Sequence, residues 1–169
     1  MTVRGMNSSI HMRGKKAKPR DIKPDLKYGN VILAKFINHV MTRGKKSVAE
    51  HVVYGALQKA SEMGKKDAIK IFDEAIKNVS PQVEVRTRRV GGANYQVPMP
   101  VRGERQNALS FRWIIGAARA KKGQAMAKKL ATVLFEASQG LGDAIKKRDD
   151  VHRMAEANKA FAHFARFSR

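Results

Sequence analysis

The chain of 169 residues contains no cysteine, an absence that excludes disulfide bonds, thiol catalysis and thiolate metal sites together. Acidic residues are also few, because 14 Asp and Glu stand against 35 Lys and Arg. No apolar run approaches the roughly 18 residues that would cross a membrane, and the start lacks the regions of a secretion signal. These absences predict an intracellular protein that has no metal site, no cofactor and no membrane contact.

The excess of positive charge is the strongest feature of the composition. A formal net charge of +21 repels itself in a compact state unless an anion neutralises it. Phosphate chains are the commonest anionic partners, because Lys and Arg release condensed counterions when they bind phosphate. Nucleic acid is therefore the expected partner, and membrane surfaces and acidic proteins are its competitors.

The first 20 residues have basic side chains, no acid and no apolar periodicity. This pattern predicts a flexible basic arm at residues 1–20, followed by a single domain at 21–169. A transit peptide is the rival interpretation of such a start. The arm contributes four candidate RNA contacts: Lys15, Lys16, Lys18 and Arg20.

Apolar residues spaced three and four positions apart predict six helices. They are expected at residues 29–43, 47–63, 67–79, 104–121 and 125–138, and from 149 onward. Gly44 and Gly64 are interpreted as helix stops, and Asp67 and Asp149 as helix starts.

After the third predicted helix the apolar period changes to two, which predicts a two-stranded antiparallel β-ribbon at about 82–101, turning at 90–94. Pro98 and Pro100 share one parity, so both missing N–H groups belong to one edge, which cannot accept a third strand. An isolated ribbon is marginally stable in water, so its tip is expected to need a partner. The predicted fold is mainly α, a bundle of about six helices with a protruding ribbon between the third and fourth.

The stretch between Glu104 and Glu136 contains seven basic residues and no acid. On the fourth predicted helix, three arginines seven positions apart share one face, and apolar residues occupy the other. The lack of nearby acids favours nucleic-acid contact over an ion-paired solvent face. The basic residues of this stretch are Arg105, Arg112, Arg119, Lys121, Lys122, Lys128 and Lys129.

Signals for an enzyme are poor. The run Gly44-Lys45-Lys46-Ser47 does not fit a phosphate-binding loop, which needs glycine at position 39 and Ser or Thr at position 46. The five histidines lack the spacing of metal ligands. No catalytic constellation is predicted.

Three segments closely resemble the small-subunit ribosomal protein number seven family of the bacterial type. They are DLKYGNVILAKFINHVMTRGKKSVAEHVVYGAL at 25–57, VRTRRVGGANYQVPMPV at 85–101 and DDVHRMAEANKAFAHF at 149–164. The resemblance implies a helical domain with a β-ribbon that binds the 3′ major domain of small-subunit rRNA early in assembly and organises the head. It also implies a ribbon near exit-site tRNA and the mRNA path, neighbouring head and platform proteins, and a cytoplasmic ribosome, with an organellar ribosome as the alternative.

The resemblance also implies residue roles. The rRNA-binding candidates that it adds are Lys35, Lys45, Lys46, Arg86, Arg88, Arg89, Lys146, Lys147 and Arg148, and Arg102 beyond the ribbon joins the same set. The candidates nearest tRNA and mRNA are Gly91, Gly92, Ala93, Asn94 and Tyr95. The long basic arm and the final ARFSR depart from the family pattern, which leaves the contacts of both termini open.

Two other classes of function compete with a ribosomal role. An architectural DNA-binding protein is the runner-up, since basic ribbons on helical bodies also grip duplexes. Such proteins usually wedge an apolar residue between base pairs, whereas this ribbon turns at GGAN. A nucleic-acid enzyme is third, because the residues for its chemistry are lacking.

Overall fold

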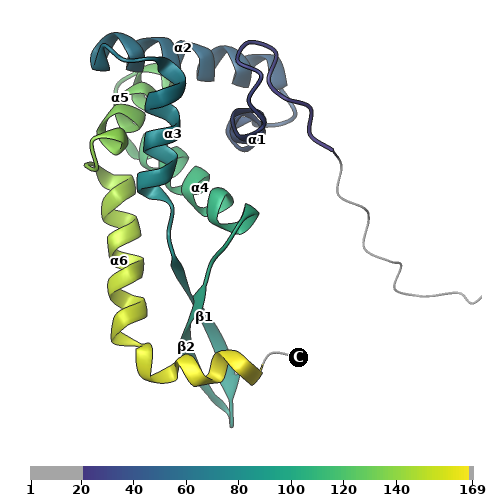
Figure 1. Cartoon of the computed structure of the whole chain (residues 1–169), viewed down its shortest axis with the longest axis vertical. Coiled ribbons are helices and arrows are strands. Elements are labelled where there is room, and N and C mark those ends of the chain that lie inside the picture. Colours follow the sequence, from purple (N-terminus) through teal and green to yellow (C-terminus); the bar gives the residue numbers. More distant parts are fainter. Residues whose placement is uncertain (1–20, 168–169) are drawn as a thin grey trace, which may run out of the picture.

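A computed structural model describes residues 21–167 of the chain (Figure 1). In this range the elements are α1 (Val31–Val40), α2 (Lys46–Gly64), α3 (Ala68–Val79), β1 (Val83–Val90), β2 (Ala93–Pro100), α4 (Glu104–Ala120), α5 (Met126–Ser138), α6 (Asp143–Ala157) and the 3-10 helix η1 (Lys159–Phe167). The predicted mainly helical fold, with a two-stranded antiparallel ribbon between the third and fourth helices, is confirmed. The arm predicted at 1–20, with Lys15, Lys16, Lys18 and Arg20, lies outside the described residues.

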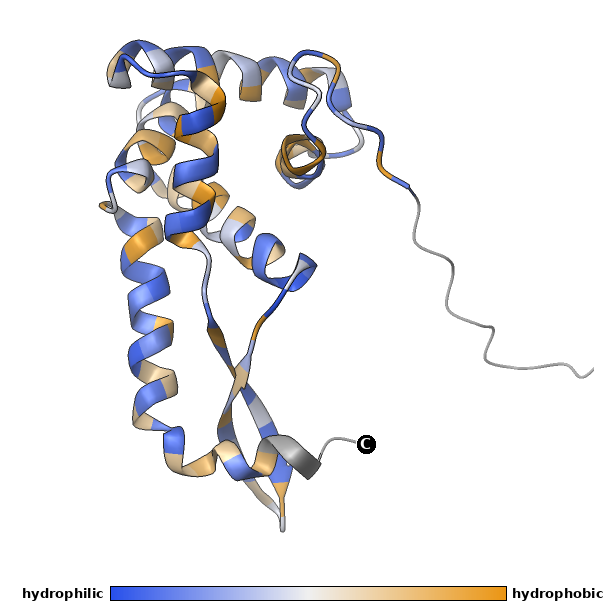
Figure 2. Cartoon of the chain, viewed as in Figure 1, coloured by the Kyte–Doolittle hydropathy of each residue, from blue (hydrophilic) through white to orange (hydrophobic). Residues whose placement is uncertain are grey.

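The core is built where the first five helices meet. Phe36 of α1 packs edge-to-face against Phe72 of α3 and Phe111 of α4, with ring centroids 5.4 Å apart in both pairs. All three rings are fully buried, and each such pair adds about 0.5–1.5 kcal/mol beyond the burial of its area. Apolar residues line the helix sides that face one another, whereas most of α6 is hydrophilic (Figure 2). The five helices thus form one body, from which the ribbon and α6 extend.

Helix α2 presents small residues to the core. Ala49, Val53 and Ala56 are buried, and the small side chains let α2 lie close to α5. Val48, the residue before Ala49, is instead 56% exposed. At the start of this helix alanine, and not valine, therefore supplies the contact with the core.

Side chains fix several of the helix ends. Oδ1 of Asn30 accepts hydrogen bonds from the backbone N–H groups of Ile32 and Leu33 at 2.8 and 3.2 Å, which starts α1. Asp67 accepts from Ile69 N–H at 3.4 Å, so the predicted start of α3 is confirmed.

The two predicted helix stops differ in accuracy. Helix α1 ends at Val40, because Met41 turns to extended backbone well before Gly44. At the end of α2 the left-handed residue is Lys65, with φ 49°, and Gly64 is the last helical residue.

The ribbon turns through two glycines. Val90 pairs with Ala93, and Gly91 and Gly92 lie between them at φ 57° and 90°. Positive φ at both central positions is typical of the tight hairpin turn that matches strand twist. The turn is therefore shorter than the predicted 90–94.

The backbone bonds of the ribbon explain its two prolines. Val101 donates its backbone N–H to Gln82 O at 2.9 Å. Along an antiparallel pair, opposite residues alternate between pairs that exchange backbone hydrogen bonds and pairs that do not. Pro98 and Pro100 consequently face Val85 and Val83 in pairs that exchange no bonds. The prediction that both prolines belong to one outer edge is consistent with this register.

The last helix begins earlier than predicted. Gly142, with φ 93°, precedes α6, which starts at Asp143 and not at Asp149. The predicted start was wrong because Asp149 and Asp150 are residues typical of a helix start but lie inside α6. Lys146, Lys147 and Arg148 therefore belong to α6 itself and not to a loop before it.

The ribbon is not isolated, in contrast to the sequence-based expectation. Helix α6 runs beside β1, and η1 crosses β2 near the far end of the ribbon (Figure 1). The ring of Tyr95 lies 5.2 Å from the rings of both Phe161 and Phe164, measured between centroids. The partner that a marginal ribbon requires is supplied, at least in part, by the C-terminal segment of the same chain.

Candidate nucleic-acid interface

Many of the predicted basic contacts are free of internal partners. Arg112 and Arg119 project from α4 as exposed side chains, and Lys122 follows that helix. Among the described residues, the exposed candidates without an ion-pair partner are Lys45, Arg89, Arg102, Arg112, Arg119, Lys122, Lys128 and Lys147. These side chains can neutralise phosphate without breaking an existing ion pair.

The fold brings Lys45 and Arg119 together, although they are far apart in the sequence. Both line a cleft of about 230 Å³ between the start of α2 and the end of α4. Exposed Val48 lines the same cleft, so two cations flank an apolar floor.

Arg105 differs from the other two arginines of its stripe. Its Nε and Nη2 donate to Oε2 of Glu84 at 3.1 and 2.9 Å, and Glu84 is only 8% exposed. Glu84 also pairs with Arg86 of its own strand. The expectation that no acid pairs with this stripe is therefore wrong at Arg105, because β1 brings Glu84 to α4.

Other candidates take part in ion pairs that hold elements together. Lys35 of α1 pairs with Glu104 of α4 at 2.6 Å, and Lys121 pairs with Glu136 of α5 at 2.8 Å. Arg148 of α6 pairs with Asp149 at 2.6 Å and also donates to the backbone carbonyl of Asn78 in α3. For Arg148, which is half-buried, the contacts indicate a structural role in docking α6.

Two candidates form ion pairs within one helix. Lys46 pairs with Glu50 at 3.8 Å and Lys146 with Asp143 at 3.6 Å. Exposed pairs of this kind contribute only about 0.3–0.5 kcal/mol, so phosphate can displace them readily.

The ribbon arginines do not share one face. Alternation along β1 places Arg86 and Arg88 on one side and Arg89 on the other. Arg88 is half-buried, with Nη2 3.8 Å from the sulfur of Met99, whereas Arg89 is exposed. Arg89 is thus the ribbon arginine most available to a partner.

The tip of the ribbon is exposed except for its aromatic residue. Gly91, Gly92, Ala93 and Asn94 are all open to solvent. Tyr95, predicted to be near tRNA, is half-buried, and its ring is directed to the aromatic side chains of η1. The exposed tip therefore offers small residues and backbone and not an aromatic ring.

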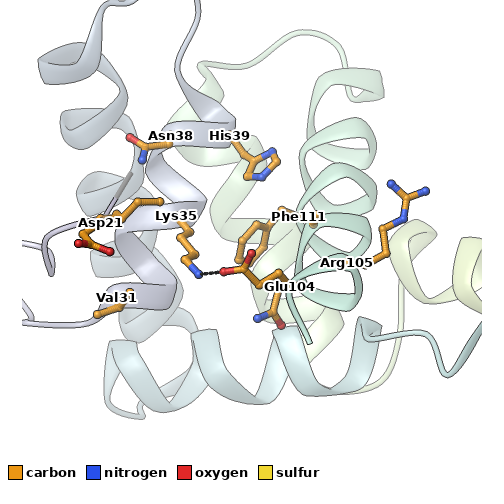
Figure 3. Close-up of a pocket in the computed structure, with 11 residues that line it drawn as sticks. Asp21, Val31, Lys35, Asn38, His39, Glu104, Arg105 and Phe111 are labelled. Atoms are coloured by element: carbon orange, nitrogen blue, oxygen red, sulfur yellow. Dashed lines mark hydrogen bonds and ion pairs between the residues drawn. The ribbon is translucent and has the colours of Figure 1, made fainter. Parts of the chain in front are cut away.

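A larger cleft of about 670 Å³ lies between α1 and α4 (Figure 3). The Lys35–Glu104 ion pair joins the two helices across it, and the hydrogen bond from Lys35 is the main cause of a lowered pKa of Glu104. The imidazole of His39 lies 5.4 Å from the ring of Phe111. Burial, and secondarily the charge of Arg112, lowers the pKa of His39.

His39 and Asn107 are site residues that the sequence did not predict. Asn107 also lines the α1–α4 cleft, and its side-chain amide has no hydrogen-bond partner among the described residues. The sequence held no signal for this site, because the two residues are 68 positions apart and line one cleft only through helix packing.

The residues that the structure describes include no group of His, Cys, Asp and Glu side chains arranged to hold a metal ion. Within the same range, every helix is too short or too polar to cross a membrane.

The comparisons with known proteins agree on one family. A sequence model of the family described as ribosomal protein S7p/S5e matches residues 12–159. The small ribosomal subunit protein uS7 of Teredinibacter turnerae is 57% identical over 145 residues, which are 86% of this chain and 93% of that protein. Proteins of the same name from Marinobacter nauticus and Pseudomonas aeruginosa are each 55% identical over 152 residues, or 90% of this chain and 97% of those proteins.

Proposed function

Because the chain belongs to the ribosomal protein S7p/S5e family of the small ribosomal subunit, and so is a structural protein and not an enzyme, we propose that it binds rRNA directly. The proposed ligand is the 3′ major domain of the small-subunit rRNA. By binding it early, the protein nucleates assembly of the subunit head.

The observation that supports this proposal best is the set of exposed cations without internal partners. Arg112, Arg119 and Lys122 form one group at α4, and Lys45 adjoins Arg119 across a small cleft. Unpaired cations on a protein of net charge +21 repel one another unless phosphate lies against them. An rRNA fold, with phosphates on many sides, neutralises more of them than a small anion does.

We further propose that the tip of the ribbon lies near exit-site tRNA and the mRNA path. The tip residues 91–94 are exposed and small, and glycine allows close approach of a backbone to a crowded partner. Arg89, opposite Asn94 in the register, adds a free charge beside the tip. Neighbouring head and platform proteins complete the surroundings of the chain in a cytoplasmic ribosome.

The test is incorporation into small subunits reconstituted without this protein, followed by sedimentation at high magnesium. The variant Arg112→Gln/Arg119→Gln/Lys122→Gln should bind about 10-fold or more weakly, since each loses a phosphate contact. The control Lys59→Gln/Lys70→Gln/Lys77→Gln removes the same charge from exposed positions on α2 and α3. Equal losses in the two triple variants would contradict a localised interface.

The same particles test the ribbon tip. Subunits that contain Arg89→Gln/Asn94→Ala should assemble but release exit-site tRNA faster than wild type. The control Thr87→Ala/Gln96→Ala changes another exposed register pair of the ribbon. Unaltered tRNA retention in the tip variant would refute the role of the tip while leaving rRNA binding intact.

A further inference from the structure

The α1–α4 cleft has the size and lining of a ligand site. Its volume of about 670 Å³ lies within the roughly 300–1,000 Å³ typical of small-molecule sites. Phe111, Ala108 and Val31 supply apolar wall, and polar side chains from both helices stand around it (Figure 3). An apolar cleft with a few polar groups is the composition that binds flat, polar-edged molecules.

Polar side chains in the cleft have hydrogen-bonding capacity to spare. Asn107 is half-buried and Asn38 is exposed at the rim, and neither side-chain amide has a partner among the described residues. An asparagine amide offers two N–H donors and one carbonyl acceptor, which match the edge of a nucleobase. The structural alternative is that water alone satisfies both amides.

His39 adds a second donor and acceptor pair. Burial and the nearby Arg112 lower the pKa of its imidazole, so the ring is neutral at pH 7. A neutral imidazole donates from one nitrogen and accepts at the other. The ring of Phe111 behind it is buried, so the apolar surface left open to a flat ring is that of Val31 and Ala108.

A free cation adjoins the cleft lining. Arg112 follows Phe111 on α4, is exposed and has no ion-pair partner among the described residues, and its charge contributes to the lowered pKa of His39. Lys35 is less available, because Glu104 neutralises it. Arg112 can therefore hold the phosphate of a nucleotide whose base enters the cleft.

We propose that the α1–α4 cleft binds one unstacked nucleotide of the RNA, with the base against Val31 and Ala108, its polar edge on Asn107 and His39, and its phosphate on Arg112. This inference rests on the proposed rRNA binding and adds a specific subsite to it. Bases that leave the stack in RNA loops and bulges are held by stacking and by hydrogen bonds to their edges. A paired base in a duplex cannot enter such a cleft.

The test compares two double variants of the full chain in binding to a fragment of the 3′ major rRNA domain. His39→Ala/Asn107→Ala should lower affinity about 10- to 100-fold, the effect expected when one bound base is lost. Its log-log salt slope should stay unchanged, because no phosphate contact is removed, whereas Arg112→Gln should make the slope about one unit shallower. The control is His51→Ala/Gln58→Ala, which changes two exposed residues of α2. Phe111 stays unaltered because it belongs to the core.

A fully paired RNA duplex of equal length separates a base site from a general defect. The His39→Ala/Asn107→Ala variant should bind the duplex as well as wild type does. An equal loss on duplex and fragment, or no loss on the fragment relative to the control, would overturn the subsite. Failure of wild type to bind the fragment at all would instead overturn the proposed function.

Discussion

Glu84 shows how a single acid organises a basic surface. Its carboxylate is buried at the foot of the ribbon, where it joins Arg86 of β1 to Arg105 of α4. The two guanidinium groups remain about half exposed, so they can face RNA while Glu84 holds them in place. The negative charge of Glu84 therefore favours RNA binding indirectly, because it positions two arginines that can contact the RNA.

Replacement of Glu84 by Gln should weaken RNA binding, although the added net positive charge alone would strengthen it. The change raises the net charge by one, yet it should lower the free energy of unfolding by about 1–2 kcal/mol, because charge-assisted hydrogen bonds to two arginines are lost. It should also weaken rRNA binding, because Arg86 and Arg105 lose their fixed positions. Glu62→Gln is the control, with the same charge change on the exposed face of α2. Denaturant unfolding and RNA titration measure both effects, and tighter RNA binding by both variants would contradict this role for Glu84.

The lowered pKa of His39 predicts that folding stability decreases as the pH falls. Its folded-state pKa is lowered from the ordinary 6.5, by burial first and by Arg112 second, so the unfolded chain takes up the proton first as pH falls. Protonation of the unfolded state then lowers folding stability from about pH 7 downward, until the folded imidazole also titrates. His39→Gln should reduce the loss of thermal stability between about pH 7.5 and 5.5. Identical pH profiles for wild type and His39→Gln would contradict the assignment.

At the scale of elements, the C-terminal η1 and the ribbon depend on each other. A 3-10 helix of nine residues is unusual, because such helices rarely exceed three or four residues unaided. The aromatic contacts of Phe161 and Phe164 with Tyr95 provide tertiary support. Replacement of residues 88–96 by a short turn would thus also undock η1, because it removes Tyr95.

The variant Tyr95→Ala tests this dependence. Loss of the ring should undock η1 and raise amide hydrogen exchange at residues 161–164 about 10-fold or more, because the ring of Tyr95 contacts both Phe161 and Phe164. The main body should keep its thermal transition, since its core lies elsewhere. Gln96→Ala, the next residue on the opposite face, should change neither. Unaltered exchange in Tyr95→Ala would show that other contacts hold η1.

The sequence predicted the elements that local patterns encode. Period-two residues around Gly91-Gly92 predicted the ribbon, and Asp67 before an apolar stripe predicted the start of α3. It could not predict pairs that form only when distant elements meet. Glu84 and Arg105 are 21 positions apart, and the docking of η1 on Tyr95 depends on the length and direction of α6.

In the candidate site, too, only the features encoded by local sequence could be predicted. Charge density identified Arg112 and Arg119 as free cations, because neither needs a tertiary partner to be exposed. It could not separate them from Arg105 or Arg148, whose partners come from other elements. The α1–α4 cleft was missed altogether, because helix packing creates it.

At the scale of the whole molecule, RNA binding depends on an extended surface rather than on any one residue. Exposed, unpaired cations occur on the α1–α2 loop, the ribbon, α4, α5 and α6. Removing one of them should cost little, because the remaining charges still attract the RNA. The collective charge of the surface is therefore the property to measure.

The most direct test is the salt dependence of binding to a 3′ major domain rRNA fragment, measured from about 50 to 400 mM monovalent salt. Each neutralised phosphate contributes roughly −0.7 to −0.9 to the log-log slope, so six or more contacts predict a slope of about −4 or steeper. Arg112→Gln/Arg119→Gln/Lys122→Gln should make this slope shallower by about two to three units. A wild-type slope shallower than about −2 would contradict the claim that this basic surface makes the main contribution to rRNA binding.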